Sequence, residues 1–174
     1  MRLGERFDPA PQLDASVEIA ERRGCDAHPL DPSRPPDRET LVACTWPDQL
    51  ERLVQLDAAL GVAADDPVPI DRAPAGEWLE RQLSEPRPGR ATVVFNSLVL
   101  QYLDEAERVR VRAAIEEAGT GATAQAPLAW LRMEPGGDLA DVRLRVWPGG
   151  EDALVARAGY HGRPVHWLGV DAGR

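Results

Sequence analysis

The chain has 174 residues, a formal net charge of −9, 43% hydrophobic residues and 28% charged residues. These values are typical of a globular protein of one domain, and from the elements below we expect a single α/β domain over residues 1–174. The acidic balance argues against nucleic acid as a partner, and no apolar run approaches the roughly 20 residues that span a membrane. Residues 1–14 contain no apolar signal segment, so the sequence predicts a cytoplasmic protein.

The first predicted elements are a helix and a strand. Residues 14–23 fit a short helix with Asp14 as its N-cap. Residues 25–31 fit a short strand that ends in an acid, Asp31. The proline-rich residues 32–38 predict a loop.

The next stretch predicts two helices with a strand between them. Leucines and valines recur at helical spacing over residues 45–64, with Pro47 near the first helical position. Residues 67–70 fit a short strand that leads to Asp71, and residues 74–83 fit a second helix.

The centre of the chain reads as a buried strand, a loop and an amphipathic helix. Residues 91–95 are β-branched and aromatic, which is typical of a strand covered on both faces in a parallel sheet. Asp104, with Glu107 three residues later, predicts a helix start, and Gly119 predicts its end. The expected buried stripe is Ala106, Val109, Val111, Ala113 and Ile115, and Arg112 and Glu116 are expected to pair.

The C-terminal part predicts a strand over residues 127–133 and then an antiparallel meander. Its strands are expected over residues 142–147, 154–160 and 164–168, separated by glycine-containing turns. Residues 142–147 alternate apolar residues with arginine, so we expect the valines and leucine to face the core and both arginines to face water.

Asn96, Ser97 and Tyr102 follow the central strand. Ligands of open α/β sheets bind outside the carboxyl ends of the strands, so these three residues are the pocket candidates, with Asp31 or Asp71 nearby. The alternative is that Asn96 and Ser97 only cap the junction between strand and loop.

Other chemistry finds less support in the sequence. A serine hydrolase would place Ser97 between two glycines, and the residues FNSLV contain none. His161 and His166, with Glu134 or Asp138, could bind a metal, or they could be turn and strand histidines, and we expect no metal. The chain contains no lysine, which excludes Schiff-base and P-loop chemistry here.

The order of elements resembles a class I S-adenosylmethionine-dependent methyltransferase from its second strand onward. Several words also look like an uncharacterised bacterial family, domain of unknown function 2332: RRGCDAHPLDP, WPDQLERL, TVVFNS, QYL, PLAWLRMEP, WPGG and YHGRPVHWL. The resemblance implies a Rossmann-like, mostly parallel sheet with helices on both faces and a C-terminal antiparallel hairpin or meander. It also implies that Asp31 matches the acid that holds the cofactor ribose and that Asp71 matches the acid near the adenine amine.

Members of that family are about twice this long and carry a glycine-rich cofactor segment, which this chain lacks along with the first strand. We therefore expect the chain to be the C-terminal part of a larger fold, with S-adenosylmethionine a cofactor of the family rather than of this chain alone. The first reading is a methyltransferase-like domain that is inactive alone. The second is a non-enzymatic interaction module that pairs with itself or with an N-terminal partner, and the third is a small hydrolase.

Overall fold

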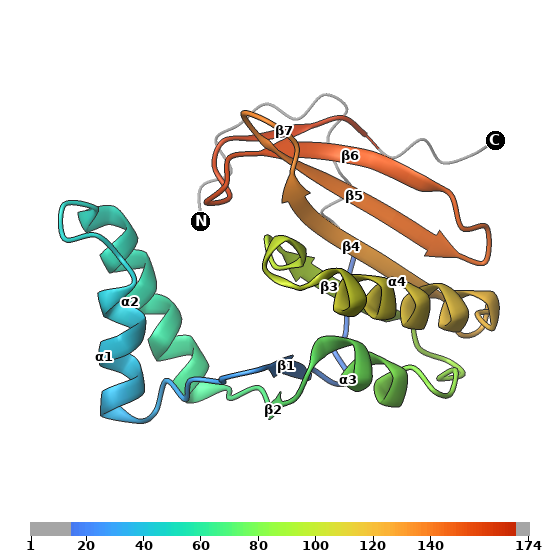
Figure 1. The fold of residues 1–174 in the computed structure, drawn as a ribbon, viewed down its shortest axis with the longest axis horizontal. Helices are drawn as coiled ribbons and strands as arrows, with labels where there is room; N and C mark the ends of the chain where they lie inside the picture. The colour runs from blue at the N-terminus through green and yellow to red at the C-terminus, as the bar shows by residue number, and fades with distance from the viewer. Residues whose placement is uncertain (1–14, 170–174) are drawn as a thin grey trace. The chain divides into compact units, whose positions relative to one another are not determined.

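The computed structural model describes residues 15–169, so the predicted cap Asp14 lies outside the described residues. The chain divides into two compact units, Val17–Ala75 and a unit formed mainly by Gly76–Arg174. Figure 1 labels the elements of both units, each of which is described by itself below.

The unit Val17–Ala75 contains a two-stranded parallel sheet. Strand β1 (Gly24–Asp26) pairs with β2 (Ile70–Arg72), and Cys25 lies opposite Asp71. β1 is shorter than expected and ends at Asp26. Residues 15–23 form no helix, which makes that prediction wrong over the described residues.

A helical hairpin, α1 (Pro35–Ala43) followed by α2 (Leu50–Asp65), lies between these two strands in the chain. The sequence predicted α2 but gave part of α1 to a proline-rich loop. Pro35 and Pro36 occupy the first helical positions, where the missing N–H costs nothing because no helical partner exists for it. Helix α2 begins at Leu50, after Pro47, and continues past Gly61 to Asp65. Gly61 therefore lies inside the helix and does not end it.

The second unit carries a five-stranded sheet with the order β3-β4-β5-β6-β7. The strands are β3 (Thr92–Ser97), β4 (Leu128–Pro135), β5 (Ala140–Trp147), β6 (Asp152–Ala158) and β7 (Val165–Trp167). The helices are α3 (Ala75–Gln82), the 3₁₀ turn η1 (Leu100–Tyr102) and α4 (Glu105–Thr120).

Only the β3–β4 pair of this sheet is parallel, and the other three pairs are antiparallel. The expectation of a mostly parallel sheet is therefore wrong, while the C-terminal meander is confirmed. The physical reason is connection length. Short turns connect each strand from β4 to β7 with the next, and such turns allow only antiparallel pairing. A parallel pair needs a longer crossover connection, and in this sheet α4 supplies one between β3 and β4. The Rossmann-like part of the prediction remains a prediction.

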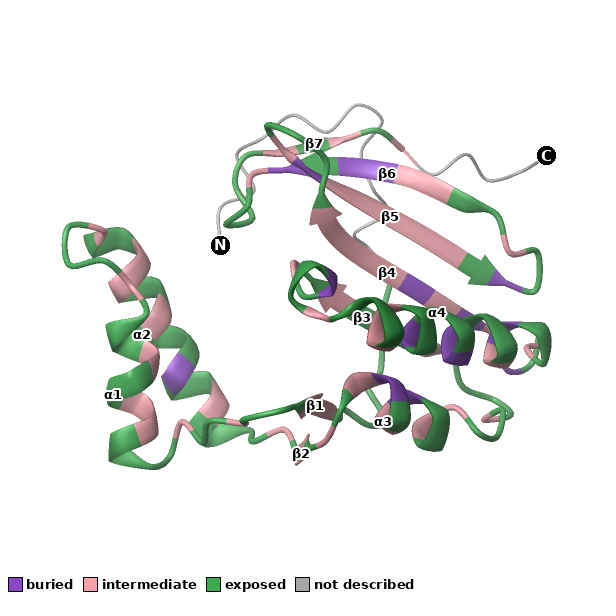
Figure 2. Ribbon diagram, viewed as in Figure 1, coloured by how far each residue is buried: buried purple, intermediate pink, exposed green. Residues whose placement is uncertain are grey.

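Helix α4 covers one face of the sheet (Figures 1 and 2). Asp104 caps it, since its carboxylate accepts a hydrogen bond from the Glu107 backbone N–H at 2.8 Å. Val109, a predicted member of the buried stripe, is 55% exposed instead. The buried residues recur at helical spacing and are Val111, Ala114, Ile115 and Gly119.

The opposite face of β3 is open. Val93 and Phe95 are 59% and 64% exposed, so the prediction that this strand is covered on both faces is wrong. Val93, Ala129 and Val146 share a row across three strands on this face. Val94 lies on the α4 side and is half-buried, whereas the two apolar side chains of the other side, Val93 and Phe95, are exposed.

The facing expected for β5 is wrong at Arg145 and Val146, while Val142, Arg143 and Leu144 are all half-buried. Arg145 faces α4, where its Nη1 bonds Glu116 at 3.0 Å and its guanidinium lies 4.6 Å from the centre of the Trp147 ring. Val146 is 43% exposed on the other face. Stacking on tryptophan lets a long arginine side chain cover apolar surface while its charge is paired, so alternation alone assigned the wrong face.

Candidate functional site

The carboxyl end of β3 carries a hydrogen-bonded cluster centred on Asn96. The Asn96 side-chain oxygen accepts a bond from Trp130 Nε1 at 2.8 Å, and its Nδ2 donates to Glu134 Oε1 at 2.7 Å. Trp130 and Glu134 lie on β4, the strand next to β3. These two bonds fix the orientation of the Asn96 amide, because the tryptophan can only donate and the carboxylate can only accept.

Glu134 also holds the turn that follows β3. Its Oε1 accepts the backbone N–H groups of Val99 and Leu100, each at 3.3 Å. Leu98, just before them, has a φ of 54°, the left-handed region that a leucine seldom adopts. One carboxylate oxygen therefore binds the side chain of the strand and the backbone of the turn, and this organises the junction.

Ser97 and Tyr102 are both exposed near this junction, Tyr102 by 81% on η1. His166 lies on β7, at the opposite edge of the five-stranded sheet from β3. Four strand spacings of about 4.8 Å separate such edges by roughly 19 Å, so Ser97 and His166 cannot share a hydrogen bond. This geometry does not support a Ser97–His166 hydrolase site.

Asp31 and Asp71 lie in the other unit, each with neighbours of its own. Asp31 accepts hydrogen bonds from the backbone N–H and hydroxyl of Ser33, at 2.9 and 2.6 Å. These bonds, with Arg34 nearby, hold the pKa of the Asp31 carboxyl below its usual value. Asp71 lies on β2, with Arg23 at 3.7 Å. Asp31 thus serves the turn that leads into α1, while the proposed cofactor roles of both acids remain predictions.

Among residues 15–169, no group of three histidine, cysteine or acidic side chains could hold a metal ion. Nor is any helix in that part of the chain long and apolar enough to cross a membrane.

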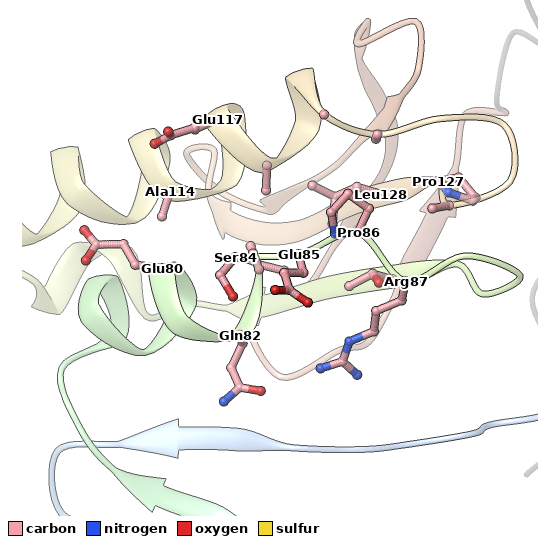
Figure 3. A pocket seen from close by; sticks show the side chains of 16 residues that line it. Glu80, Gln82, Ser84, Glu85, Pro86, Arg87, Ala114, Glu117, Pro127 and Leu128 are labelled. Atoms are coloured by element: carbon pink, nitrogen blue, oxygen red, sulfur yellow. The ribbon is translucent and has the colours of Figure 1, made fainter.

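A shallow pocket of about 410 Å³ opens at the amino ends of β3 and β4 (Figure 3). Its lining comes from the end of α3, the following loop, the C-terminal half of α4 and the start of both strands. Figure 3 shows Pro86 and Leu128 next to each other, with Ser84 and Glu85 nearby, while the charged ends of Glu117 and Arg87 point away. Because this pocket lies at the other ends of the strands, it does not test the predicted pocket at Asn96, Ser97 and Tyr102, which remains a prediction.

A row of arginines crosses the α4 face of the sheet, and the sequence pattern did not predict it. Arg132 lies 4.5 Å from the Trp130 ring centre and shares the Asp152 carboxylate with Arg143, its partner on β5. Among the residues that the structure describes, Arg132 Nη1 is buried without a hydrogen-bond partner. The sequence feature that points to this row is the spacing of Trp130, Arg132 and Glu134 on β4. Residues two apart in a strand lie on the same face.

The outer edge of β3 is the remaining candidate surface. Thr92 N–H donates to the Pro127 carbonyl and Leu98 N–H donates to the Met133 carbonyl, so even-numbered residues direct their backbone toward β4. Val93, Phe95 and Ser97 then direct their N–H and C=O groups outward. Within residues 15–169, β3 has β4 as its one strand neighbour.

A comparison with protein families assigns the chain. The model of a family described as an uncharacterized protein conserved in bacteria (DUF2332) matches residues 2–167. The chain belongs to the DUF2332 family. This match confirms the family that the sequence motifs predicted. No curated protein and no solved structure matches the chain, so the resemblance to methyltransferases has no support from these comparisons.

Proposed function

We propose that this DUF2332 chain is an interaction module that lengthens its five-stranded sheet by pairing strand β3 with β3 of a second copy. The observation that carries the proposal is the open edge of β3. Within residues 15–169 no strand pairs with the three outward residues of this edge, and two of them, Val93 and Phe95, are more than half exposed. Exposed, apolar and uncharged edges favour the addition of another strand.

The edge is self-complementary. An antiparallel pair centred on Phe95 sets Phe95 opposite its own copy and Val93 opposite Ser97. All three outward residues then meet an outward residue, as hydrogen-bonded pairs of an antiparallel ladder require. No residue of Thr92–Ser97 is charged, so no like charges meet across such a pair despite the net charge of −9.

The test is sedimentation of the whole chain together with residue-resolved hydrogen exchange. We expect a dimer in which the Val93, Phe95 and Ser97 amides are protected in addition to those bonded to β4. Phe95→Asp sets two carboxylates opposite each other and should raise the dimer dissociation constant at least about tenfold. Val109→Asp adds the same charge at a similarly exposed apolar site on α4 and should leave the dimer intact.

Two results would reject self-pairing. One is a monomer at all concentrations whose odd-numbered β3 amides exchange freely. The other is a dimer that tolerates both Phe95→Asp and Val93→Asp. Protection that develops only when a separate N-terminal chain is added would favour the N-terminal partner instead.

Methyl transfer is the alternative function, and it rests on the order of elements alone. At the end of β3, the Asn96 amide already hydrogen-bonds to Trp130 and Glu134, so it is not free to bind a cofactor. Without a glycine-rich turn to let the backbone approach a cofactor, we expect no heat when S-adenosylmethionine is titrated into the chain. Micromolar binding would restore this reading.

A further inference from the structure

Helix α2 is apolar on two opposite sides. Leu53, Leu56 and Leu60 recur at helical spacing on one side, which is the less exposed one. On the other side, Leu50, Val54 and Val62 are 68%, 71% and 67% exposed, and Ala58 completes their i, i+4 spacing. We call the residues Leu50, Val54, Ala58 and Val62 the outer stripe. A helix that is apolar on both sides is normally covered on both sides.

The hairpin has almost no core of its own. In the unit Val17–Ala75, all of which is described, Leu60 is the only buried apolar side chain, at 4% exposure. Helix α1 contributes no buried residue, as its colours in Figure 2 show. A hydrogen bond of 2.6 Å from Arg38 to Asp57 ties it to α2. So little buried surface gives the hairpin little stability, and covering the outer stripe would add the missing burial.

The charges around the outer stripe are acidic. At 100° per residue, Glu51 and Asp65 fall within the arc of the outer stripe, near its two ends, and Asp57 falls at its border, whereas Arg52 falls on the far side. Asp57 is paired with Arg38. Within residues 15–169, Glu51 and Asp65 have no ion-pair partner, so their charge is available to a ligand.

These charges distinguish the occupants that an exposed apolar stripe could accept. A second copy would bring the same acids against each other, and like charges suppress such pairing. A membrane surface attracts helices with basic polar faces, the opposite of this one. We propose that the outer stripe binds an amphipathic helix of another protein whose apolar side chains are flanked by lysine or arginine.

This surface lies in the other unit from β3 and does not depend on strand pairing. It uses the helix-in-groove mode, in which apolar anchors at i, i+4 and i+7 give affinity and flanking charges give selectivity. Trp46 is exposed in the loop that leads to α2, and its fluorescence offers a probe of binding.

The experiment titrates two synthetic 18-residue helical peptides into the whole chain. Both carry the same leucine stripe, flanked by lysine in one and by glutamate in the other. We expect the lysine peptide to bind with a dissociation constant below about 100 μM, and the glutamate peptide to bind at least about tenfold more weakly. Equal binding of both peptides, or no binding of the lysine peptide at 1 mM, would overturn the proposal.

Matched variants locate the site. Val54→Asp puts a charge in the outer stripe and should weaken the lysine peptide at least about tenfold. Ala59→Asp puts the same charge at an exposed position off the stripe and should change binding less than about twofold. If both variants bind alike, or if Val54→Asp instead dissolves a dimer of the chain itself, the stripe is not the proposed site.

A charge reversal keeps the test independent of any loss of folding. The double variant Glu51→Lys, Asp65→Lys should bind the glutamate peptide better than the lysine peptide, because only the flanking charges have changed. Circular dichroism checks that the helix content is unchanged. An unchanged preference for the lysine peptide would contradict the assignment.

Discussion

Gly119 brings helix α4 directly against the indole of Trp147. A Cβ atom at this position would lie 2.5 to 2.8 Å from three atoms of the ring, and both residues are buried. We therefore expect Gly119→Ala to lower the free energy of unfolding by about 1–3 kcal/mol through overpacking, measured by urea denaturation.

The control for this change is Gly121, which caps the same helix. A Cβ there meets its nearest atom at 3.6 Å, an ordinary contact, and its φ is −87°. Gly121→Ala should be neutral or stabilising by up to about 1 kcal/mol. Equal losses for the two alanine variants would mean that backbone freedom, and not the indole contact, sets the cost. The sequence predicted a helix end at Gly119 because glycine is a common stop, but it could not reveal a partner on β5.

Asn96 gives a second prediction at the scale of single residues, this time with a pH dependence. Asn96→Asp sets a carboxylate where the amide now donates to Glu134 at 2.7 Å. Two close carboxylates raise the pKa of one of them in the folded state, so the loss of stability should be full at pH 7 and should shrink as the pH falls toward 4. We expect about 1–3 kcal/mol at pH 7.

Denaturation at the two pH values, with Ser97→Ala as the control, checks the Asn96 prediction. Ser97 is exposed, and its replacement should stay within about 0.5 kcal/mol. If Asn96→Asp lowers the free energy of unfolding equally at pH 4 and pH 7, the new carboxylate does not interact with that of Glu134.

At the scale of elements, an ion pair joins α3 to α4. Arg110 Nε and Nη2 donate to the two carboxylate oxygens of Glu80 at 2.7 and 2.6 Å. These bonds hold the pKa of Glu80 below its usual value and raise that of Arg110. Since the folded-state pKa of Glu80 is depressed, its stabilising effect is present above the ordinary value of 4.5 and is lost as the pH falls through the lower, folded value.

Glu80→Gln should therefore lower the urea midpoint near pH 7 and have little effect once Glu80 is protonated. Salt should reduce the difference, because both side chains are partly exposed. A double-mutant cycle with Arg110→Gln isolates the pair, and Glu77→Gln, in an ion pair within α3, is the control. Additive effects of Glu80→Gln and Arg110→Gln would mean that the two helices are not coupled through this contact.

The elements that the sequence predicted well are those with a local cause. The spacing of leucine gave α2, the cap at Asp104 gave the start of α4, and turn glycines gave the meander. The elements it missed depend on partners far along the chain. Arg145 is on the α4 face because Trp147 and Glu116 are there, and alternation cannot supply that information.

At the scale of the whole molecule, the sequence predicted the family and an α/β chain but not the separation into two units. It also identified Asn96 as a residue of interest without indicating that Trp130 and Glu134 bind both ends of its amide. The residues missed by sequence reasoning are therefore the partners. The sequence shows the chemistry of each side chain, whereas its neighbour across a sheet is known only once the register of the strands is known.

The single parallel pair of the five-stranded sheet also has a consequence for the order in which the second unit assembles. β4 through β7 are joined by short turns, whereas Thr92 pairs with Leu128 only after the whole of α4 has been traversed. Closing the longer loop costs more chain entropy, so we expect the β4–β7 meander to form first and β3 to dock last. Pulse-labelled hydrogen exchange during refolding should then protect β5 and β6 amides before that of Val94, and simultaneous protection would contradict this order. A chain still on the ribosome, or one beginning to melt, would thus expose the apolar edge of β4 as well as that of β3.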